Sequence, residues 1–160
     1  MKLFLSLFLA LGLSISSYAQ VTAFGYDENP SGTLYVTGEP LPKVRIGSIL
    51  NLEWVFDLWM EGWSGLVLGA DTPVRANLCW YSEDPLDLLN KWLLVAPMWH
   101  LGYKHGAEGW WVYPLQIPPD PALAGIVFRI QAFYQADSWM GGTHCSRLRG
   151  TNGLKITLSY

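Results

Sequence analysis

The sequence predicts an all-β protein, an antiparallel β-sandwich with one or two short helical turns. Two observations support this prediction. Apolar residues recur at every second position in several segments, as in strands that bury one face. Glycine, proline, asparagine and aspartate separate these segments, whereas helical periodicity is scarce. Several short alternating strands joined by turns indicate two antiparallel sheets packed face to face.

The N-terminal segment is typical of an export signal. One lysine precedes an apolar run, Leu3–Leu13, of about 11 residues, which is too short to span a bilayer. Small residues follow at the positions that a signal peptidase reads, so we expect cleavage between Ala19 and Gln20. The prediction is a signal peptide over residues 1–19 and a single β-sandwich domain over residues 20–160. This domain is expected to be secreted or periplasmic, without a transmembrane segment.

Charge and cysteine content narrow the classes of function. The 160-residue chain has a net charge of −3 and no basic run, which argues against nucleic-acid binding because that depends on neutralising phosphates. A domain of this size buries enough surface to fold without a metal, and we expect no cofactor. In an exported protein, Cys79 and Cys145 are expected to form a disulfide, and two buried thiols are the alternative.

Three segments alternate most regularly. Their expected inward rows are Leu50, Leu52, Trp54, Phe56 and Leu58 in SILNLEWVFDL, Ile126, Phe128, Ile130, Ala132 and Tyr134 in GIVFRIQAFYQAD, and Leu154, Ile156, Leu158 and Tyr160 in GLKITLSY. Shorter strand candidates are TLYVTG, GLVLGAD and ANLCWYS. SEDPLDLLNKWLL could form a helical turn or a loop running into a strand. In PPDPALAG, Asp120 can cap a single turn that Pro121 begins and Gly125 closes.

Several motifs occur together along the chain: Phe24-Gly25, Leu41-Pro42 with Gly47-Ser48, Val67-Leu68-Gly69, Ile117–Gln131 and Thr151–Leu158. In this combination the chain resembles an uncharacterised family of secreted β-sandwich modules that abound in planctomycetes and related bacteria. The family pattern includes IPNDPSLAGLTFYAQA and SNGLEVTL. The resemblance implies the fold and export, and it supplies no catalytic residues. The family often has a cysteine where this chain has Tyr26-Asp27, and it is rich in leucine and glycine where this chain is rich in tryptophan.

Tryptophan is unusually frequent, with nine residues, and it can either fill a core or present a flat contact face. In the predicted strand WWVYPLQI, adjacent side chains point to opposite faces. Trp111 shares its row with tyrosine, leucine and isoleucine, so we expect Trp111 to point inward and Trp110 outward. Pro114 cannot donate a hydrogen bond to a neighbour, which predicts that this strand lies at an edge of its sheet.

The outward Trp110 suggests a binding surface. If its strand pairs through the proline-rich turn with residues 126–136, Trp110 faces Phe133. Arg129 and Gln131 would then lie nearby on the same outer face, and such a mixture suits either a sugar or a protein partner. These four residues are our candidate binding site. If the two strands belong to opposite sheets, the pairing fails but the outward direction of Trp110 remains.

Three patterns with catalytic or metal-binding potential are interpreted as structural. His100, His105 and His144 do not have a spacing that makes three or four zinc ligands converge, so we interpret them as surface or loop histidines and expect no metal site. GWSGL lacks the spacing of a nucleophile elbow, so Ser64 is interpreted as part of a turn between strands. Paired carboxylates need a cleft between them, for which a chain of this size has little room.

The expected function is therefore that of an exported, non-catalytic protein. Exposed aromatic residues would bind glycan or another extracellular surface. The alternative is a structural or assembly protein that uses the same residues as a protein–protein interface, and a small hydrolase is less favoured. A row of exposed aromatic side chains flanked by polar groups would favour glycan, whereas a broad apolar patch would favour a protein partner.

Overall fold

The structure, a computed structural model, describes residues 20–27, 29, 32–37, 44–56, 62–78, 92–106, 110–136 and 148–160. The predicted signal peptide, Cys79, Cys145 and most of the first predicted helical segment lie outside the described residues. The strands are β1 (Gln20–Phe24), β2 (Gly32–Thr37), β3 (Ile49–Phe56), β4 (Gly62–Ala70), β5 (Pro73–Asn77), β6 (Trp92–Val95), β7 (Trp99–Gly106), β8 (Trp110–Gln116), β9 (Val127–Ala136) and β10 (Leu148–Thr157). A 3-10 turn, η2 (Pro121–Leu123), lies between β8 and β9.

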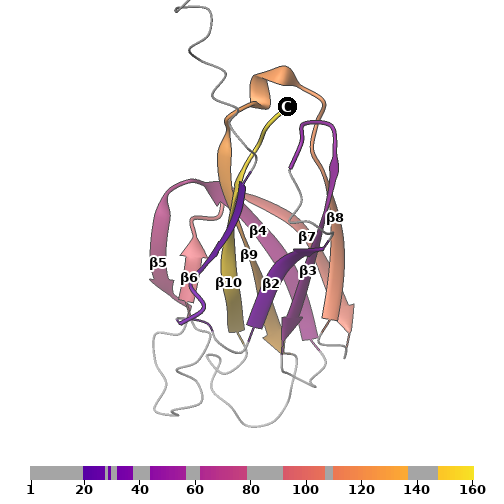
Figure 1. Ribbon diagram of the computed structural model, residues 1–160. Coiled ribbons are helices and arrows are strands. Elements are labelled where there is room, and N and C mark those ends of the chain that lie inside the picture. Colours follow the sequence, from indigo (N-terminus) through magenta and orange to yellow (C-terminus); the bar gives the residue numbers. More distant parts are fainter. Residues whose placement is uncertain are drawn as a thin grey trace, which may run out of the picture.

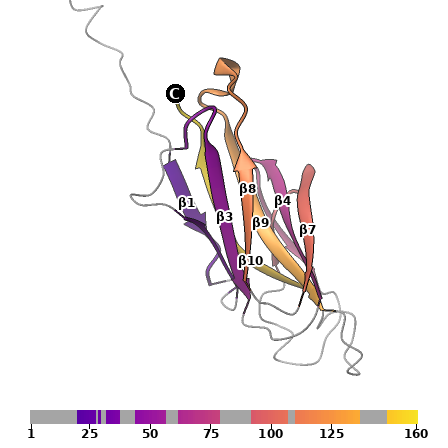
Figure 2. The ribbon, with the colours of Figure 1, turned by 90° about the vertical axis from the view of Figure 1, so that its right-hand side faces the viewer.

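The strands form two main layers and a flanking pair. A five-stranded sheet has the order β1-β10-β9-β4-β7, a three-stranded sheet has the order β2-β3-β8, and β5 pairs with β6. Neighbouring strands are antiparallel throughout these sheets. Figures 1 and 2 show the three-stranded sheet packed against the five-stranded sheet. The predicted all-β fold of packed antiparallel sheets is thus confirmed.

The core lies between the two main sheets and is built from the predicted alternating rows. The inward residues of β3 and β9 are buried, and Trp54 and Tyr134 are at most 1 % exposed. Trp111 of β8 stacks on Trp54 with a centroid distance of 6.3 Å and contacts the ring of Tyr134 across the core at 6.0 Å. These rings join the two sheets, and Trp111 points inward as predicted.

Two predicted inward residues, Ile126 and Tyr160, are instead exposed. Ile126 stands before the first residue of β9, directly after the turn at Gly125, so it does not share the direction of the strand. At the C-terminus, β10 ends at Thr157, and the chain then forms a parallel bridge between Ser159 and Arg45. The alternation therefore stops, Ser159 becomes buried and Tyr160 turns to solvent.

Two polar motifs also lie in strands rather than in turns or loops. GWSGL begins β4, and Ser64 is a fully buried strand residue whose hydroxyl accepts a hydrogen bond from the Trp54 indole and donates to the Phe133 carbonyl at 3.1 Å. His100 and His105 belong to β7. Both histidines are exposed, so of the two alternatives they are surface residues and not loop residues, whereas His144 lies outside the described residues. The turn interpretation of Ser64 was wrong because glycines, which suggest breaks in a sequence, here provide close contacts between neighbouring strands.

A bulge in β10 ties the two sheets together. The register of β10 against β9 shifts between Gly150 and Gly153, and the intervening Asn152 is fully buried. Its Oδ1 accepts a hydrogen bond from the Leu34 N–H at 2.7 Å, and its Nδ2 donates to the Leu34 carbonyl at 3.0 Å. One amide side chain thus replaces a neighbouring strand for the edge strand β2 of the opposite sheet.

The predicted turn in PPDPALAG is confirmed as η2. The carboxylate of Asp120 accepts a hydrogen bond from the Ala122 N–H at 2.9 Å, and Pro121 occupies the start of the turn. Gly125 then adopts a φ of 78°, which glycine reaches without steric cost. This turn carries the chain from β8 in the three-stranded sheet to β9 in the five-stranded sheet (Figure 1).

Candidate binding surface

The predicted pairing of Trp110 with Phe133 is wrong, because the two residues lie in different sheets. β8 pairs with β3, which places Trp110 opposite Val55, whereas β9 lies between β10 and β4. The directions of the adjacent tryptophans nevertheless agree with the prediction. Trp111 is 5 % exposed and Trp110 is 53 % exposed, so Trp110 remains a surface residue without the predicted neighbours.

Gln131 does not lie on an exposed face as predicted. It is only 1 % exposed, because β6 covers this part of the five-stranded sheet. Its Oε1 accepts a hydrogen bond from the Leu94 N–H at 2.8 Å, and its Nε2 donates to the carbonyls of Trp92 and Thr151 at 2.9 and 2.8 Å. Asn29 also donates to both carbonyls, so Gln131 belongs to a buried polar cluster.

Arg129 lies on the outer face of the five-stranded sheet and is engaged by its neighbours. Its Nε is 2.8 Å from the Asp71 carboxylate, which also accepts a hydrogen bond from Lys155 at 2.7 Å. Hydrogen bonds from Lys155 and then Arg129 hold the pKa of Asp71 below its ordinary value. The guanidinium of Arg129 also lies over the Phe24 ring at 4.8 Å. These contacts are structural and lie on a different sheet from Trp110.

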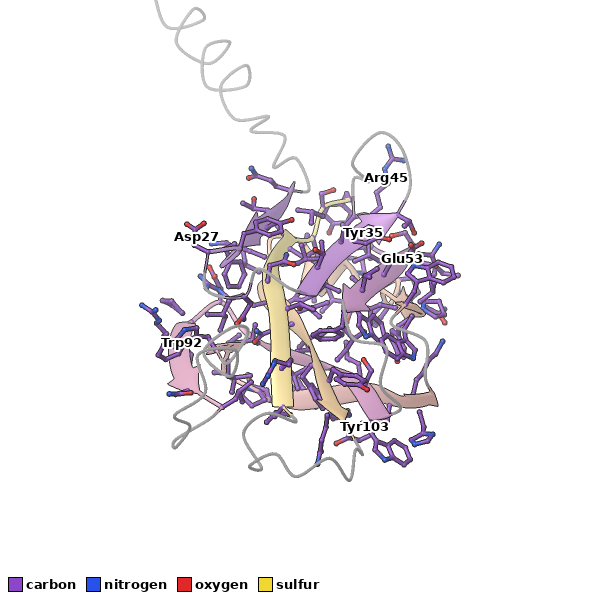
Figure 3. All side chains as sticks on the ribbon, turned by 90° about the horizontal axis from the view of Figure 1, so that it is seen from below. Asp27, Tyr35, Arg45, Glu53, Trp92 and Tyr103 are labelled. Carbon is purple, nitrogen blue, oxygen red and sulfur yellow. The ribbon has the colours of Figure 1, made fainter. Side chains whose placement is uncertain are left out.

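The actual polar neighbours of Trp110 are Glu53 and Tyr35. The Trp110 indole N–H donates to Glu53 Oε2 at 3.3 Å, and Tyr35 stands directly opposite Glu53 in the register of β2 and β3. Figure 3 shows Tyr35 and Glu53 side by side. Burial raises the pKa of Tyr35, as does its hydrogen bond to Glu53, while the Trp110 indole partly opposes the increase. The indole and phenol thus converge on one carboxylate, which restrains both rings.

The outer face of the three-stranded sheet carries polar and apolar side chains in about equal number around this group. Strand alternation and register place the following residues on that face: Thr33, Tyr35, Thr37, Ile49, Asn51, Glu53, Val55, Trp110, Val112, Pro114 and Gln116. Within this described set, Glu53 is the residue with a charged side chain. We call this set the Trp110 face. It combines an exposed aromatic ring with hydroxyl, amide and carboxylate groups, which is the mixture suited to sugar recognition.

The edge of the Trp110 face is formed by β8, as Pro114 predicted. β8 is the last strand of the three-stranded sheet. From the opposite sheet, Lys104 of β7 extends its ammonium group to the Val112 carbonyl at 2.9 Å. This bond occupies a backbone acceptor of β8, and proline lacks a backbone donor, so both features discourage another strand from joining this edge.

A second group of aromatic side chains lies on the outer face of β7, β4 and β9. His100 stacks on Tyr103 at a centroid distance of 3.8 Å, and the edge of Phe133 approaches both rings. The Trp63 and His105 rings lie 4.7 Å apart in the next row. We call these five residues the β7 aromatic cluster. Its rings stack or tilt against one another, and Tyr103 and Trp63 still present much of their surface to solvent.

Local backbone features assemble this cluster. The register of β7 against β4 shifts at Leu101, and this extra residue brings His100 and Tyr103 to the same face although they are three positions apart. Gly65 lies between Tyr103 and Phe133, where a Cβ atom would come within 2.9 Å of the Phe133 ring. Partial burial lowers the pKa of His100.

The part of the chain that the structure describes lacks two further kinds of functional feature. It contains no cluster of three or more histidine, cysteine, aspartate or glutamate side chains suited to a metal ion. The same part has no helix long and apolar enough to cross a membrane.

Sequence reasoning found Trp110 but missed Tyr35 and Glu53. The alternation in SILNLEWVFDL did place Glu53 on the outer side of its strand. Nothing local indicated that this strand lies between β2 and β8. The chain matches no protein-family model, no curated protein and no solved structure among those with which it was compared.

Proposed function

We propose that this protein is a non-catalytic glycan-binding module and that the Trp110 face is its contact surface. The observation that carries the proposal is the exposed Trp110 ring, 53 % exposed, whose indole N–H is bound to Glu53. An aromatic ring can pack against the C–H groups of a sugar, while neighbouring polar groups bind its hydroxyls. Restraint of the ring before binding lowers the entropic cost of association.

The expected mode of binding is weak at each site and strengthened by repetition of the ligand. The outer face of a sheet buries less of a ligand than a cleft does, so one sugar unit gains few contacts. A polysaccharide offers many equivalent units to each protein molecule. An insoluble polysaccharide is therefore a more sensitive probe than a monosaccharide.

The test compares retention of wild type and Trp110→Ala on a panel of insoluble polysaccharides. We expect Trp110→Ala to lose most of the retention, because the stacking surface is removed. Trp99→Ala is the matched control, since Trp99 is 60 % exposed but belongs to β7 of the five-stranded sheet and lies outside the β7 aromatic cluster. Equal retention of wild type and Trp110→Ala on every polysaccharide would refute the proposal, as would an equal loss in both variants.

Assembly into oligomers is the second candidate function, and the β7 aromatic cluster favours it. Tyr103 is 61 % exposed and Trp63 is 46 % exposed, and their neighbours are mainly other rings. Such a surface suits contact with a second copy of the chain more than binding to hydroxyl groups. Light scattering over a concentration series tests this function. A monomer at every concentration, in wild type and Tyr103→Ala alike, would exclude it.

The proposed function includes export. Residues 1–19 are the proposed signal peptide, and Cys79 and Cys145 are the proposed disulfide of the mature domain. We also propose that the chain is a member of the family of secreted β-sandwich modules. The resemblance to that family supports this membership and export alike. Mass spectrometry of the exported protein, with and without reduction, tests the cleavage between Ala19 and Gln20 and the disulfide. A mature chain that begins elsewhere, or two free thiols, would contradict the corresponding part.

A further inference from the structure

From the charge and hydrogen-bonding groups of the Trp110 face, we infer that its ligand is a neutral or amine-bearing glycan and that Glu53 rejects acidic glycans. The inference rests on the proposed function, since it names the class of glycan bound at the same surface. It assigns Glu53 a role in specificity that is separate from the stacking role of Trp110.

The position of Glu53 supports this role. It is the residue with a charged side chain among the described outward positions of β2, β3 and β8, and it lies in the central strand β3. Its carboxylate is in hydrogen-bond contact with the Trp110 indole, so a sugar stacked on the ring would lie beside the negative charge. A uronic acid or sulfated sugar would bring a like charge to this position, which is unfavourable at short range.

The hydrogen-bonding capacity of Glu53 also favours a ligand that donates hydrogen bonds. The Trp110 N–H and the Tyr35 hydroxyl are both engaged with Glu53. A carboxylate has about four acceptor positions, so acceptor capacity remains beyond these two contacts. Sugar hydroxyls and amines are donors and can use that capacity, whereas an ionised carboxylate or sulfate offers only acceptors.

A cation also lies at the border of the Trp110 face. The Lys104 ammonium group is bound to the Val112 carbonyl at the edge of β8. Val112 stands opposite Glu53 in the register of β8 and β3. The Lys104 ammonium group is therefore bound at the β8 end of the cross-strand row that contains Glu53. The negative charge is in direct contact with the indole N–H of the stacking ring, whereas the positive charge is bound to a backbone carbonyl at the strand edge.

The experiment compares three insoluble probes: cellulose as the neutral glycan, cross-linked chitosan as the amine-bearing glycan and calcium-free cross-linked alginate as the acidic glycan. Wild type is expected to bind cellulose and chitosan more strongly than alginate. Glu53→Gln keeps the side-chain shape and an acceptor for the Trp110 N–H but removes the charge. It should lower the ratio of chitosan to alginate retention by about twofold to fivefold, the range of one exposed ion pair.

Asp27→Asn is the matched charge control, because Asp27 is exposed and lies on the opposite side of the view from Glu53 (Figure 3). It removes the same net charge and should leave the ratio unchanged. Retention of alginate equal to that of cellulose, when both depend on Trp110, would overturn the inference and leave the proposed function standing. An equal change of the ratio in Glu53→Gln and Asp27→Asn would also overturn it. Retention that Trp110→Ala does not alter on any probe would refute the proposed function itself.

Discussion

Asn152 is predicted to make a large contribution to stability, because its amide replaces a strand neighbour for β2. Asn152→Ala would leave the N–H and carbonyl of Leu34 without these partners, and Leu34 is 0 % exposed. Each buried polar group left unpaired costs about 1–3 kcal/mol. The expected loss is therefore about 2–6 kcal/mol in the free energy of unfolding, a large share of the roughly 5–15 kcal/mol typical of a domain.

Urea denaturation followed by tryptophan fluorescence measures this loss, since the buried Trp54 and Trp111 rings report on the core. Asn51→Ala is the control, because Asn51 is exposed on the Trp110 face and should change stability by less than about 0.5 kcal/mol. An Asn152→Ala variant as stable as Asn51→Ala would refute the reasoning. It would mean that water or a rearranged β10 satisfies Leu34 instead.

Asn152→Asp separates the hydrogen bonds from the shape of the side chain. The ionised carboxylate can still accept from the Leu34 N–H but cannot donate to the Leu34 carbonyl, and its burial raises its pKa. Because the folded-state pKa of this aspartate would lie above the unfolded value, the penalty is greatest above the folded pKa and is relieved as pH falls through it. The stability difference from wild type should therefore narrow in acid. A difference independent of pH would contradict the pairing with the Leu34 carbonyl.

Two further predictions concern the five-stranded sheet. Gly65→Ala should destabilise the fold by about 1–3 kcal/mol, because the new methyl group would lie 2.9 Å from both the Phe133 ring and the Gly102 carbonyl; an unchanged urea midpoint would contradict this. Hydrogen bonds from Lys155 and then Arg129 lower the pKa of Asp71, so its ionised carboxylate stabilises the fold at pH values above its ordinary pKa of 3.8. This contribution to stability is lost as the pH falls through the lower pKa of the folded state. Asp71→Asn should therefore flatten the stability profile below about pH 5, and a profile parallel to that of wild type would show that Asp71 has no such role.

The alternation of apolar residues was sufficient to predict which side of a strand faces the core. It placed Trp54 and Tyr134 inward, and it separated the buried Trp111 from the exposed Trp110. This information is local, because successive side chains of any strand point to opposite faces. Asp120 and Gly125 likewise indicated a capped turn, since capping and a positive φ depend on neighbouring residues.

The partner of each strand was decided only by the tertiary structure. An alternating strand can pair with many others, so the sequence could not show that Trp110 lies beside Glu53 rather than Phe133. Gln131 is buried for the same kind of reason: β6, from a distant part of the chain, covers it and satisfies its amide. The direction of a side chain is a local property, whereas its neighbours and its exposure depend on which segments pack together. The sequence therefore determined the fold class and the outward direction of Trp110, and the packing decided the composition of the binding face.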